Sequence, residues 1–165
     1  MNLEIVDKWN KKDFLKLFDL IQKEFNCKVV WNKVIDEFGA TLCGNYYAVC
    51  DTPFRLIAIK KVRHISNRGL VHILIHELGH LVIHNLLYKR IDWLEEYIVE
   101  SVANIVTGYN GEWCPSGMCL IDYCKIKLSN TNLLNYIPLI NHYVGIIQPK
   151  MELIFRKLEE ITNGK

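Results

Sequence analysis

Two histidines and a glutamate lie within five residues of one another in the stretch His76-Glu77-Leu78-Gly79-His80, which has the pattern H-E-x-x-H. On a helix, residues four apart lie on one face, about 6 Å apart along the axis. Two imidazoles placed in this way can bind one zinc ion, and the glutamate between them can take a proton from a water at the metal. The spacing therefore predicts a zinc site at His76 and His80, with Glu77 as the general base.

The residues around this motif favour a helix. They form an apolar run from Leu70 to Leu87 that contains no proline, and Ser66 or Asn67 can cap its start. Gly79 costs about 1 kcal/mol relative to alanine inside a helix, so its presence indicates a point where something packs close to the backbone. We expect an amphipathic helix with a histidine-bearing front and an apolar back. That back would consist of Leu70, Leu74, Leu78 and Leu81.

A second helix is expected after the motif. Asp92 can cap it, Glu95 can complete a capping box, and the helix would continue from Trp93 to about Thr107. Ala103 is small enough to let this helix approach the first one closely. The second helix is therefore the expected source of a further metal ligand.

Three glutamates of the second helix are candidates for that ligand. Glu100 is the first choice, separated from His80 by residues 81–99, and Glu96 or Glu95 is the alternative. Glu96 and Glu100 are four residues apart and share a face, whereas Glu95 is expected on the solvated face. Zinc held by two histidines and one glutamate keeps a fourth position open for water, which is the catalytic arrangement rather than the structural one.

Four histidines, His72, His76, His80 and His84, are spaced four residues apart. Each step of four residues turns the side chain about 40° further around the helix axis, so only histidines next to each other in this row can bind the same metal ion easily. His72 with His76 is the alternative ligand pair. With that pair, however, Glu77 and Glu100 would no longer lie at the positions expected for the general base and the third ligand. We expect His72 and His84 to flank the site or to orient its ligands.

The segment from His76 to His84, followed by Glu100-Ser101-Val102-Ala103-Asn104, resembles the gluzincin pattern. It is similar to the ImmA/IrrE metallopeptidases and to the zincin domains of ArdC-type antirestriction proteins, which pair HELGHxxxH with a later Glu-x-x-Ala on the next helix. The resemblance covers residues 68–110. It implies zinc on His76, His80 and Glu100, with Glu77 as general base.

The remaining segments predict an α+β fold. The sequence favours a helix at Lys11–Phe25 and strands at Cys27–Trp31, Asn45–Cys50 and Arg55–Lys60. The resemblance implies a minimal zincin fold, in which a small, mostly antiparallel sheet packs against the H-E-x-x-H helix and several further helices. Similar metallopeptidases hold an extended peptide against an edge strand above the metal cleft, and we assign that role to Arg55–Lys60. Further helices are expected at Met118–Leu128, at Leu133–Ile147 with a bend near Pro138, and from Pro149 onward.

Composition limits the class of protein. The chain has 165 residues, half of them apolar, which suits one domain spanning residues 1–165. A formal net charge of +2 does not favour nucleic acid or acidic membranes as partners. The N-terminus lacks a signal-peptide pattern, and the uncharged stretch 128–149 is too polar to span a membrane. We expect a cytoplasmic protein whose six cysteines stay reduced.

The function expected first is a zinc-dependent peptidase acting on a protein or peptide substrate. By resemblance to ImmA/IrrE proteins, the substrate would be a repressor or other regulator, and the chain could belong to a mobile element. The alternative is a zinc-stabilised binding module, or an antirestriction-type protein, that acts on a protein or nucleic-acid partner without hydrolysis. A third interpretation is that the protein binds no zinc and that the spacing of its histidines is coincidental. Candidates for an oxyanion donor are Tyr46, Tyr47, His142 and Tyr143.

Overall fold

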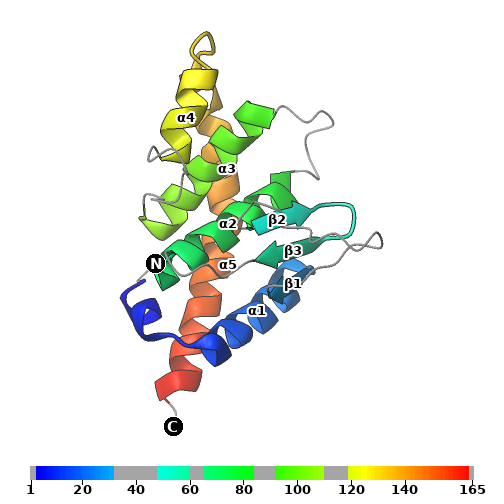
Figure 1. Cartoon of the computed structure of the whole chain (residues 1–165), viewed down its shortest axis with the longest axis vertical. Coiled ribbons are helices and arrows are strands. Elements are labelled where there is room, and N and C mark those ends of the chain that lie inside the picture. The colour runs from blue at the N-terminus through cyan, green and yellow to red at the C-terminus, as the bar shows by residue number, and fades with distance from the viewer. Residues whose placement is uncertain (1–2, 32–47, 60–64, 84–91, 110–118, 164–165) are drawn as a thin grey trace.

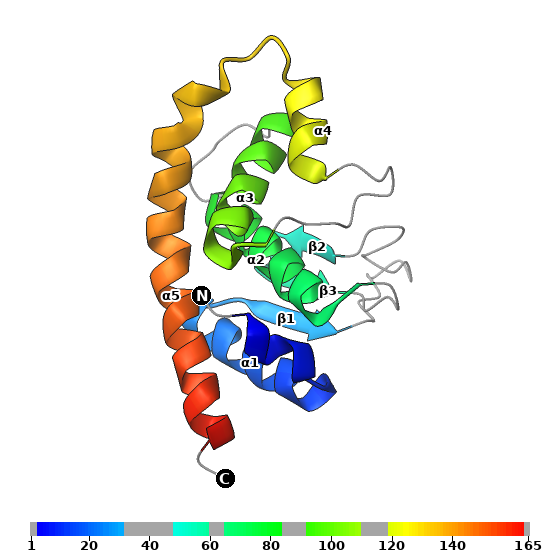
Figure 2. The ribbon, with the colours of Figure 1, turned by 90° about the vertical axis from the view of Figure 1, so that its left-hand side faces the viewer.

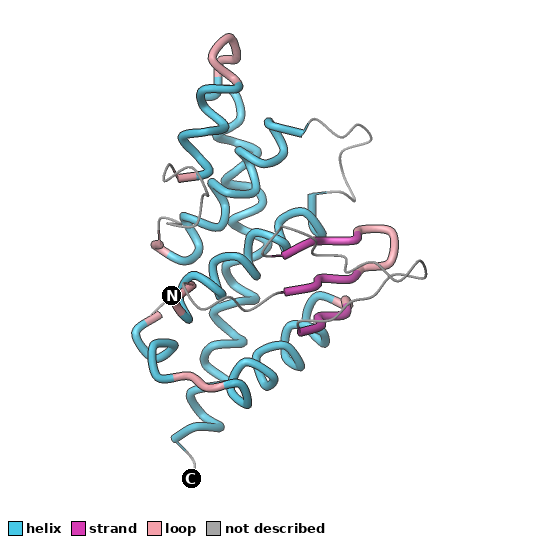
Figure 3. The backbone as a smooth tube through the Cα atoms, in the orientation of Figure 1, coloured by secondary structure: helices cyan, strands magenta, loops and turns pink. Residues whose placement is uncertain are grey.

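A computed structural model describes residues 3–31, 48–59, 65–83, 92–109 and 119–163. Helices dominate it, and a small sheet lies on one side (Figures 1 and 3). The expected α+β class is confirmed. In chain order the elements are 3-10 helix η1 (Glu4–Lys8), α1 (Lys11–Phe25), β1 (Lys28–Trp31), β2 (Ala48–Asp51), β3 (Leu56–Ile59), α2 (Asn67–Ile83), α3 (Asp92–Thr107), α4 (Leu120–Lys127), 3-10 helix η2 (Leu133–Tyr136) and α5 (Ile137–Asn163).

The sheet has the order β1-β3-β2, with β1 parallel and β2 antiparallel to the central strand. It is therefore mixed, rather than mostly antiparallel as expected. The assignment of Arg55–Lys60 as an edge strand was wrong, because β3 is hydrogen-bonded on both sides. Among the described strands, β1 and β2 are the outer ones, and a strand's outer edge is where an extended peptide can be added.

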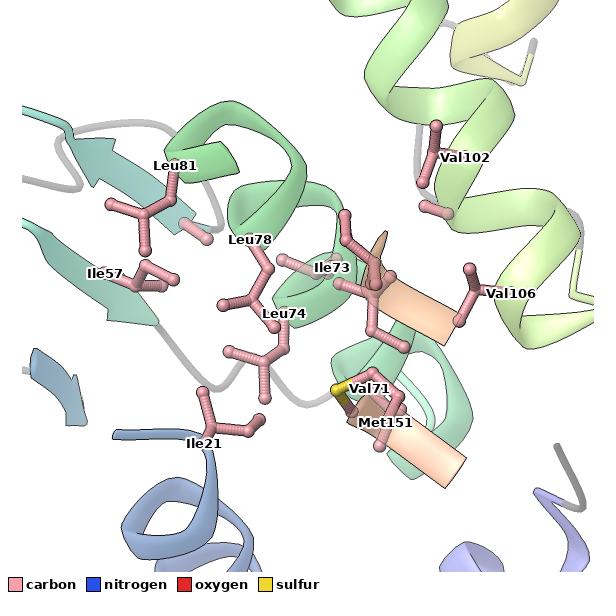
Figure 4. Close-up of a cluster of buried hydrophobic side chains, with 14 of the residues drawn as sticks. Ile21, Ile57, Val71, Ile73, Leu74, Leu78, Leu81, Val102, Val106 and Met151 are labelled. Carbon is pink, nitrogen blue, oxygen red and sulfur yellow. The ribbon is translucent and has the colours of Figure 1, made fainter. Parts of the chain in front are cut away.

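Helix α2 lies between the sheet and α3 (Figure 4). Leu81 of α2 lies beside Ile57 of β3, and Val71 of α2 lies beside Met151 of α5. The expected apolar back of α2 is buried, but so are its other faces, including His72 and His76. The helix is therefore a core helix rather than an amphipathic surface helix, because α3 covers its histidine-bearing front.

The start of α2 is fixed by two neighbouring side chains. Ser66 caps the helix, since its hydroxyl accepts from the N–H of Gly69 at 3.0 Å. The Asn67 amide instead donates to the carbonyls of Val6 and Trp9, at 3.0 and 2.8 Å. These bonds hold the N-terminal segment against the beginning of the central helix.

Helix α5 runs along one side of the molecule, past α1, α2 and α3 (Figure 2). Two helices divided at Pro149 were expected, but α5 continues through this proline from Ile137 to Asn163. Buried residues on both sides of Pro149, among them Ile147 and Met151, hold the helix against the core, which outweighs the lost backbone hydrogen bond. None of the described helices is long and apolar enough to cross a lipid bilayer.

Of the six cysteines, Cys27, Cys50, Cys119 and Cys124 are free thiols in the described part of the chain, and Cys124 is buried. Several other positions of interest lie outside the described residues. These are Cys43, Cys114, His84, Tyr46 and Tyr47.

The close approach of α2 and α3 depends on Gly79. A Cβ atom at this position would lie 2.8 Å from Cγ1 of Val99 on α3, which is closer than a real contact allows. Ala103 of α3 is also fully buried. The glycine that is unfavourable for an isolated helix therefore lets the two site-bearing helices pack together.

We expect Gly79→Ala and Gly145→Ala to change stability in opposite directions. Both glycines lie inside helices, and a Cβ at residue 145 would meet no atom within 4 Å. Gly145→Ala should therefore stabilise the protein by about 0.5–1 kcal/mol through helix propensity. Gly79→Ala should destabilise it by about 1–3 kcal/mol through overpacking against Val99. Urea denaturation of the two variants measures both effects.

The double variant Gly79→Ala/Val99→Ala provides the control. Truncation of Val99 removes its Cγ1, the closest atom to the new methyl group, and its Cγ2, and leaves only Cβ in ordinary contact at 3.4 Å. The two substitutions should therefore be less destabilising together than the sum of the single effects. A Gly79→Ala protein as stable as the wild type would contradict the close helix contact.

Candidate metal centre

His76 and His80 lie on consecutive turns of α2 and direct their Nε2 atoms to the same point. These two nitrogens are 3.2 Å apart. The Glu96 carboxylate of α3 faces both, with Oε2 at 3.2 Å from His76 Nε2 and Oε1 at 3.4 Å from His80 Nε2. One ligand atom from each of the three residues lies within 4.8 Å of the others, so the group could hold a metal ion.

Glu100, the first choice for the third ligand, lies at the opposite nitrogen of His76. Its Oε2 is 2.9 Å from His76 Nδ1, and its Oε1 is 3.1 Å from His72 Nε2. The structure therefore brings Glu96, the alternative, to the two Nε2 atoms and places Glu100 behind His76. The two glutamates share a face of α3, but they are one turn apart, and only the earlier turn lies level with the Nε2 atoms.

Glu95 is not on a solvated face, as had been expected. It is only 8% exposed, and its Oε1 lies 2.7 Å from His80 Nδ1. Both histidines of the motif therefore have a carboxylate at Nδ1, Glu100 for His76 and Glu95 for His80. Such a bond fixes the ring orientation, favours a free Nε2 for a metal and makes that nitrogen more basic.

His72 holds Glu100 from the far side. It is fully buried, and its Nδ1 lies 3.1 Å from the hydroxyl of Thr107. This hydroxyl donates to the carbonyl of Ala103 at 2.7 Å, so an Nδ1–H of His72 can donate to the hydroxyl oxygen. A buried hydrogen-bonded row, Thr107–His72–Glu100–His76, thus connects α3 to the candidate metal ligands. The His72/His76 pair, considered as alternative ligands, is separated by the Glu100 carboxylate.

Glu77 is 7% exposed and lies beside the sheet. Burial raises its pKa, although nearby His76 and His80 and a backbone hydrogen bond from Cys50 act in the opposite direction. A carboxyl with a raised pKa is a better proton acceptor near neutral pH than an exposed one. The hydrogen bond from Cys50 also ties Glu77 to β2, an outer strand of the described sheet.

The carboxylates and imidazoles strongly influence each other's protonation. Burial opposes the charge of Glu100, but hydrogen bonds from His72 and His76 outweigh it and lower its pKa to about 2. Burial likewise lowers the pKa of His80, yet hydrogen bonds to Glu95 and Glu96 raise it to about 9. Without a metal, protonated imidazoles thus balance the carboxylates around them. When the imidazoles are neutral, a bound divalent cation would balance the charge of the carboxylates instead.

Neither of the two candidate oxyanion donors that the structure describes forms a hydrogen bond to this group, although burial and the nearby Glu95 carboxylate raise the pKa of Tyr143. Tyr143 is buried, and its hydroxyl has no hydrogen-bond partner among the described residues. His142 is exposed on α5 and stacks edge-on against Tyr143.

Comparisons of the chain with protein-family models, curated proteins and solved structures found no match. The residues and the geometry of the site alone therefore indicate its chemistry.

Amide substitutions separate the roles of Glu96 and Glu100. Glu96→Gln removes an anionic oxygen from the metal-binding group and should cause the larger loss of Zn²⁺ affinity. Glu100→Gln leaves the three ligand residues in place but weakens the support of His76, so we expect a loss of about 10–100-fold. Competition with a chromophoric chelator measures both affinities.

The exposed Glu159 of α5 supplies the matched control, since Glu159→Gln makes the same chemical change far from the group. Its Zn²⁺ affinity should equal that of the wild type. A larger loss for Glu100→Gln than for Glu96→Gln would instead make Glu100 the third ligand.

The stability of the metal-free protein should fall between about pH 6.5 and pH 9. His80 has a folded-state pKa of about 9, above the ordinary histidine value of 6.5, so its stabilising contribution is complete below pH 6.5 and is lost as the pH rises through 9. Bound metal requires neutral imidazoles, so the zinc-loaded protein should lack this part of the decline. Urea denaturation at several pH values, with chelator or with zinc, tests this. Parallel pH profiles in the two states would contradict it.

Proposed function

We propose that this chain is a zinc-dependent peptidase. The observation that carries the proposal is the convergence of two imidazole Nε2 atoms and one carboxylate, with ligand atoms within 4.8 Å, while Glu77 lies buried in the same motif. Two histidines and one glutamate are a ligand set of catalytic zinc sites, which keep one position for water or substrate. The donor types therefore fit zinc.

Zinc, when bound in such a site, acts as a Lewis acid that lowers the pKa of water to about 7 and polarises a carbonyl group. Glu77 would accept the proton of the attacking water and later pass it to the leaving amine. Glu100 and Glu95 would hold His76 and His80 in the ligand orientation. His72 and Thr107 would in turn keep Glu100 in place.

The substrate proposed is an extended segment of a protein. Support comes from β2, which is an outer strand of the described sheet and is linked to Glu77 through Cys50. A peptide paired with this strand would lie beside the general base. A repressor or similar regulator, as the family resemblance suggests, remains the first candidate to assay.

Glu77→Gln should slow hydrolysis strongly while zinc binding is retained. The amide cannot accept a proton, so we expect the rate to fall by about 10²–10⁴-fold, whereas the three ligand residues are unchanged. Mass spectrometry of new N-termini in a mixture of candidate regulator proteins measures cleavage, and metal analysis measures bound zinc.

Glu159→Gln, which changes an exposed glutamate, should cleave like the wild type. Equal cleavage by wild type and Glu77→Gln would remove Glu77 as the base. If a zinc-loaded wild type cleaves nothing but still acts on a partner, and His76→Ala abolishes that action, the chain is a zinc-stabilised binding module instead.

A further inference from the structure

Helices α3 and α4 lie side by side (Figures 1 and 2), and two aromatic rings meet where α3 begins. Trp93 of α3 contacts Tyr123 of α4 edge-on, with ring centroids 5.2 Å apart and an angle of 71° between the rings. The ammonium of Lys127, one turn further along α4, lies 5.8 Å from the centre of the Trp93 ring and 5.3 Å from that of Tyr123. Trp93 and Tyr123 thus form an aromatic corner that holds a positive charge.

The aromatic corner suits a cation that comes from outside the chain. The face of an aromatic ring carries partial negative charge and attracts a cation within about 6 Å of its centre, tryptophan most strongly. Trp93 is 39% exposed, although tryptophan side chains are on average highly buried. Tyr123 is partly exposed as well. A group of another molecule can therefore reach the rings.

The cation that now lies in the aromatic corner is weakly held. Lys127 has no carboxylate partner among the described residues, whereas Lys125 on the same helix pairs with Asp122 at 3.2 Å. Lys127 is exposed, its stem is flexible, and both of its distances to the ring centres are close to the 6 Å limit. A second ammonium can therefore take its place at little cost.

The aromatic corner lies one helical turn from the candidate metal centre. Trp93 precedes Glu96 by three residues, which is about 4.5 Å along the axis of α3. Glu96 faces the Nε2 atoms of His76 and His80 at 3.2 and 3.4 Å, while Trp93 contacts α4. A polypeptide that passes the metal centre can therefore extend a long side chain to the rings.

We propose that the aromatic corner binds the ammonium of a lysine on a polypeptide that lies across the start of α3, in exchange for Lys127. Lys127 itself shows that a lysine ammonium is accepted between the two rings. Binding of this lysine does not require hydrolysis, so the inference can be tested separately from the peptidase proposal.

Two pentapeptides that differ in one charge form the matched test ligands. Both have blocked ends and four alanines, and the central residue is lysine in one and norleucine, which has the same apolar stem, in the other. NMR titration of the full chain follows the indole N–H of Trp93 and the backbone N–H of Tyr123. We expect the lysine peptide to bind in the millimolar range and the norleucine peptide about two- to fivefold more weakly.

Removal of the resident cation should strengthen binding. Lys127→Gln leaves the rings without a competing ammonium, so the lysine peptide should bind it about two- to fivefold more tightly than the wild type. Lys157→Gln removes the same charge from an exposed position near the end of α5, at the other end of the molecule (Figure 2), and should leave the affinity unchanged.

Ring variants test the contacts themselves. Trp93→Leu and Tyr123→Leu each remove a ring and should reduce or abolish the preference for lysine over norleucine. Tyr123→Phe keeps the ring face and should bind the lysine peptide like the wild type. Thermal denaturation confirms that each variant is folded.

Three results would overturn the proposal. One is equal binding of the lysine and norleucine peptides by the wild type, or no shift at either ring residue. Another is a preference for lysine that Trp93→Leu and Tyr123→Leu, both folded, leave unchanged. The last is a Lys127→Gln protein that binds the lysine peptide no more tightly than Lys157→Gln does.

Discussion

The candidate site depends on how closely α2 and α3 approach each other. Gly79 permits the approach, since any side chain there would meet Val99 at 2.8 Å. At this separation the carboxylates of α3 reach the imidazoles of α2 directly, at 2.7–3.4 Å. A wider spacing would leave the same residue types in the same order without the group of ligand atoms. The helix contact, more than the five-residue motif, therefore produces the site.

The second constraint is electrostatic. Buried carboxylates are unfavourable unless positive charge or hydrogen-bond donors lie beside them. Here both carboxylate oxygens of Glu96 and Glu100 and one oxygen of Glu95 face imidazole nitrogens. Protons on the imidazoles, or a divalent cation, can balance the charge. The buried members of this set are His72, His76, Glu77, Glu95 and Glu100.

Helix α3 carries two different surfaces. Glu95, Glu96 and Glu100 face the histidines of α2, whereas Tyr97 and Asn104 line a hollow between this helix, α4 and α5.

The local features of the site could be predicted from the sequence: the spacing of His76 and His80 on one face, Glu77 between them, and a second helix ending at about Thr107. These follow from helical periodicity, which acts over a few residues. It also indicated that Gly79 marks a close approach. The sequence could not show that Glu96 faces the Nε2 atoms while Glu100 and Glu95 hold the Nδ1 atoms, because this depends on the position of α3 relative to α2 along the helix axes. The central position of β3 and the unbroken course of α5 through Pro149 were likewise decided by strand pairing and core packing between residues distant in the chain.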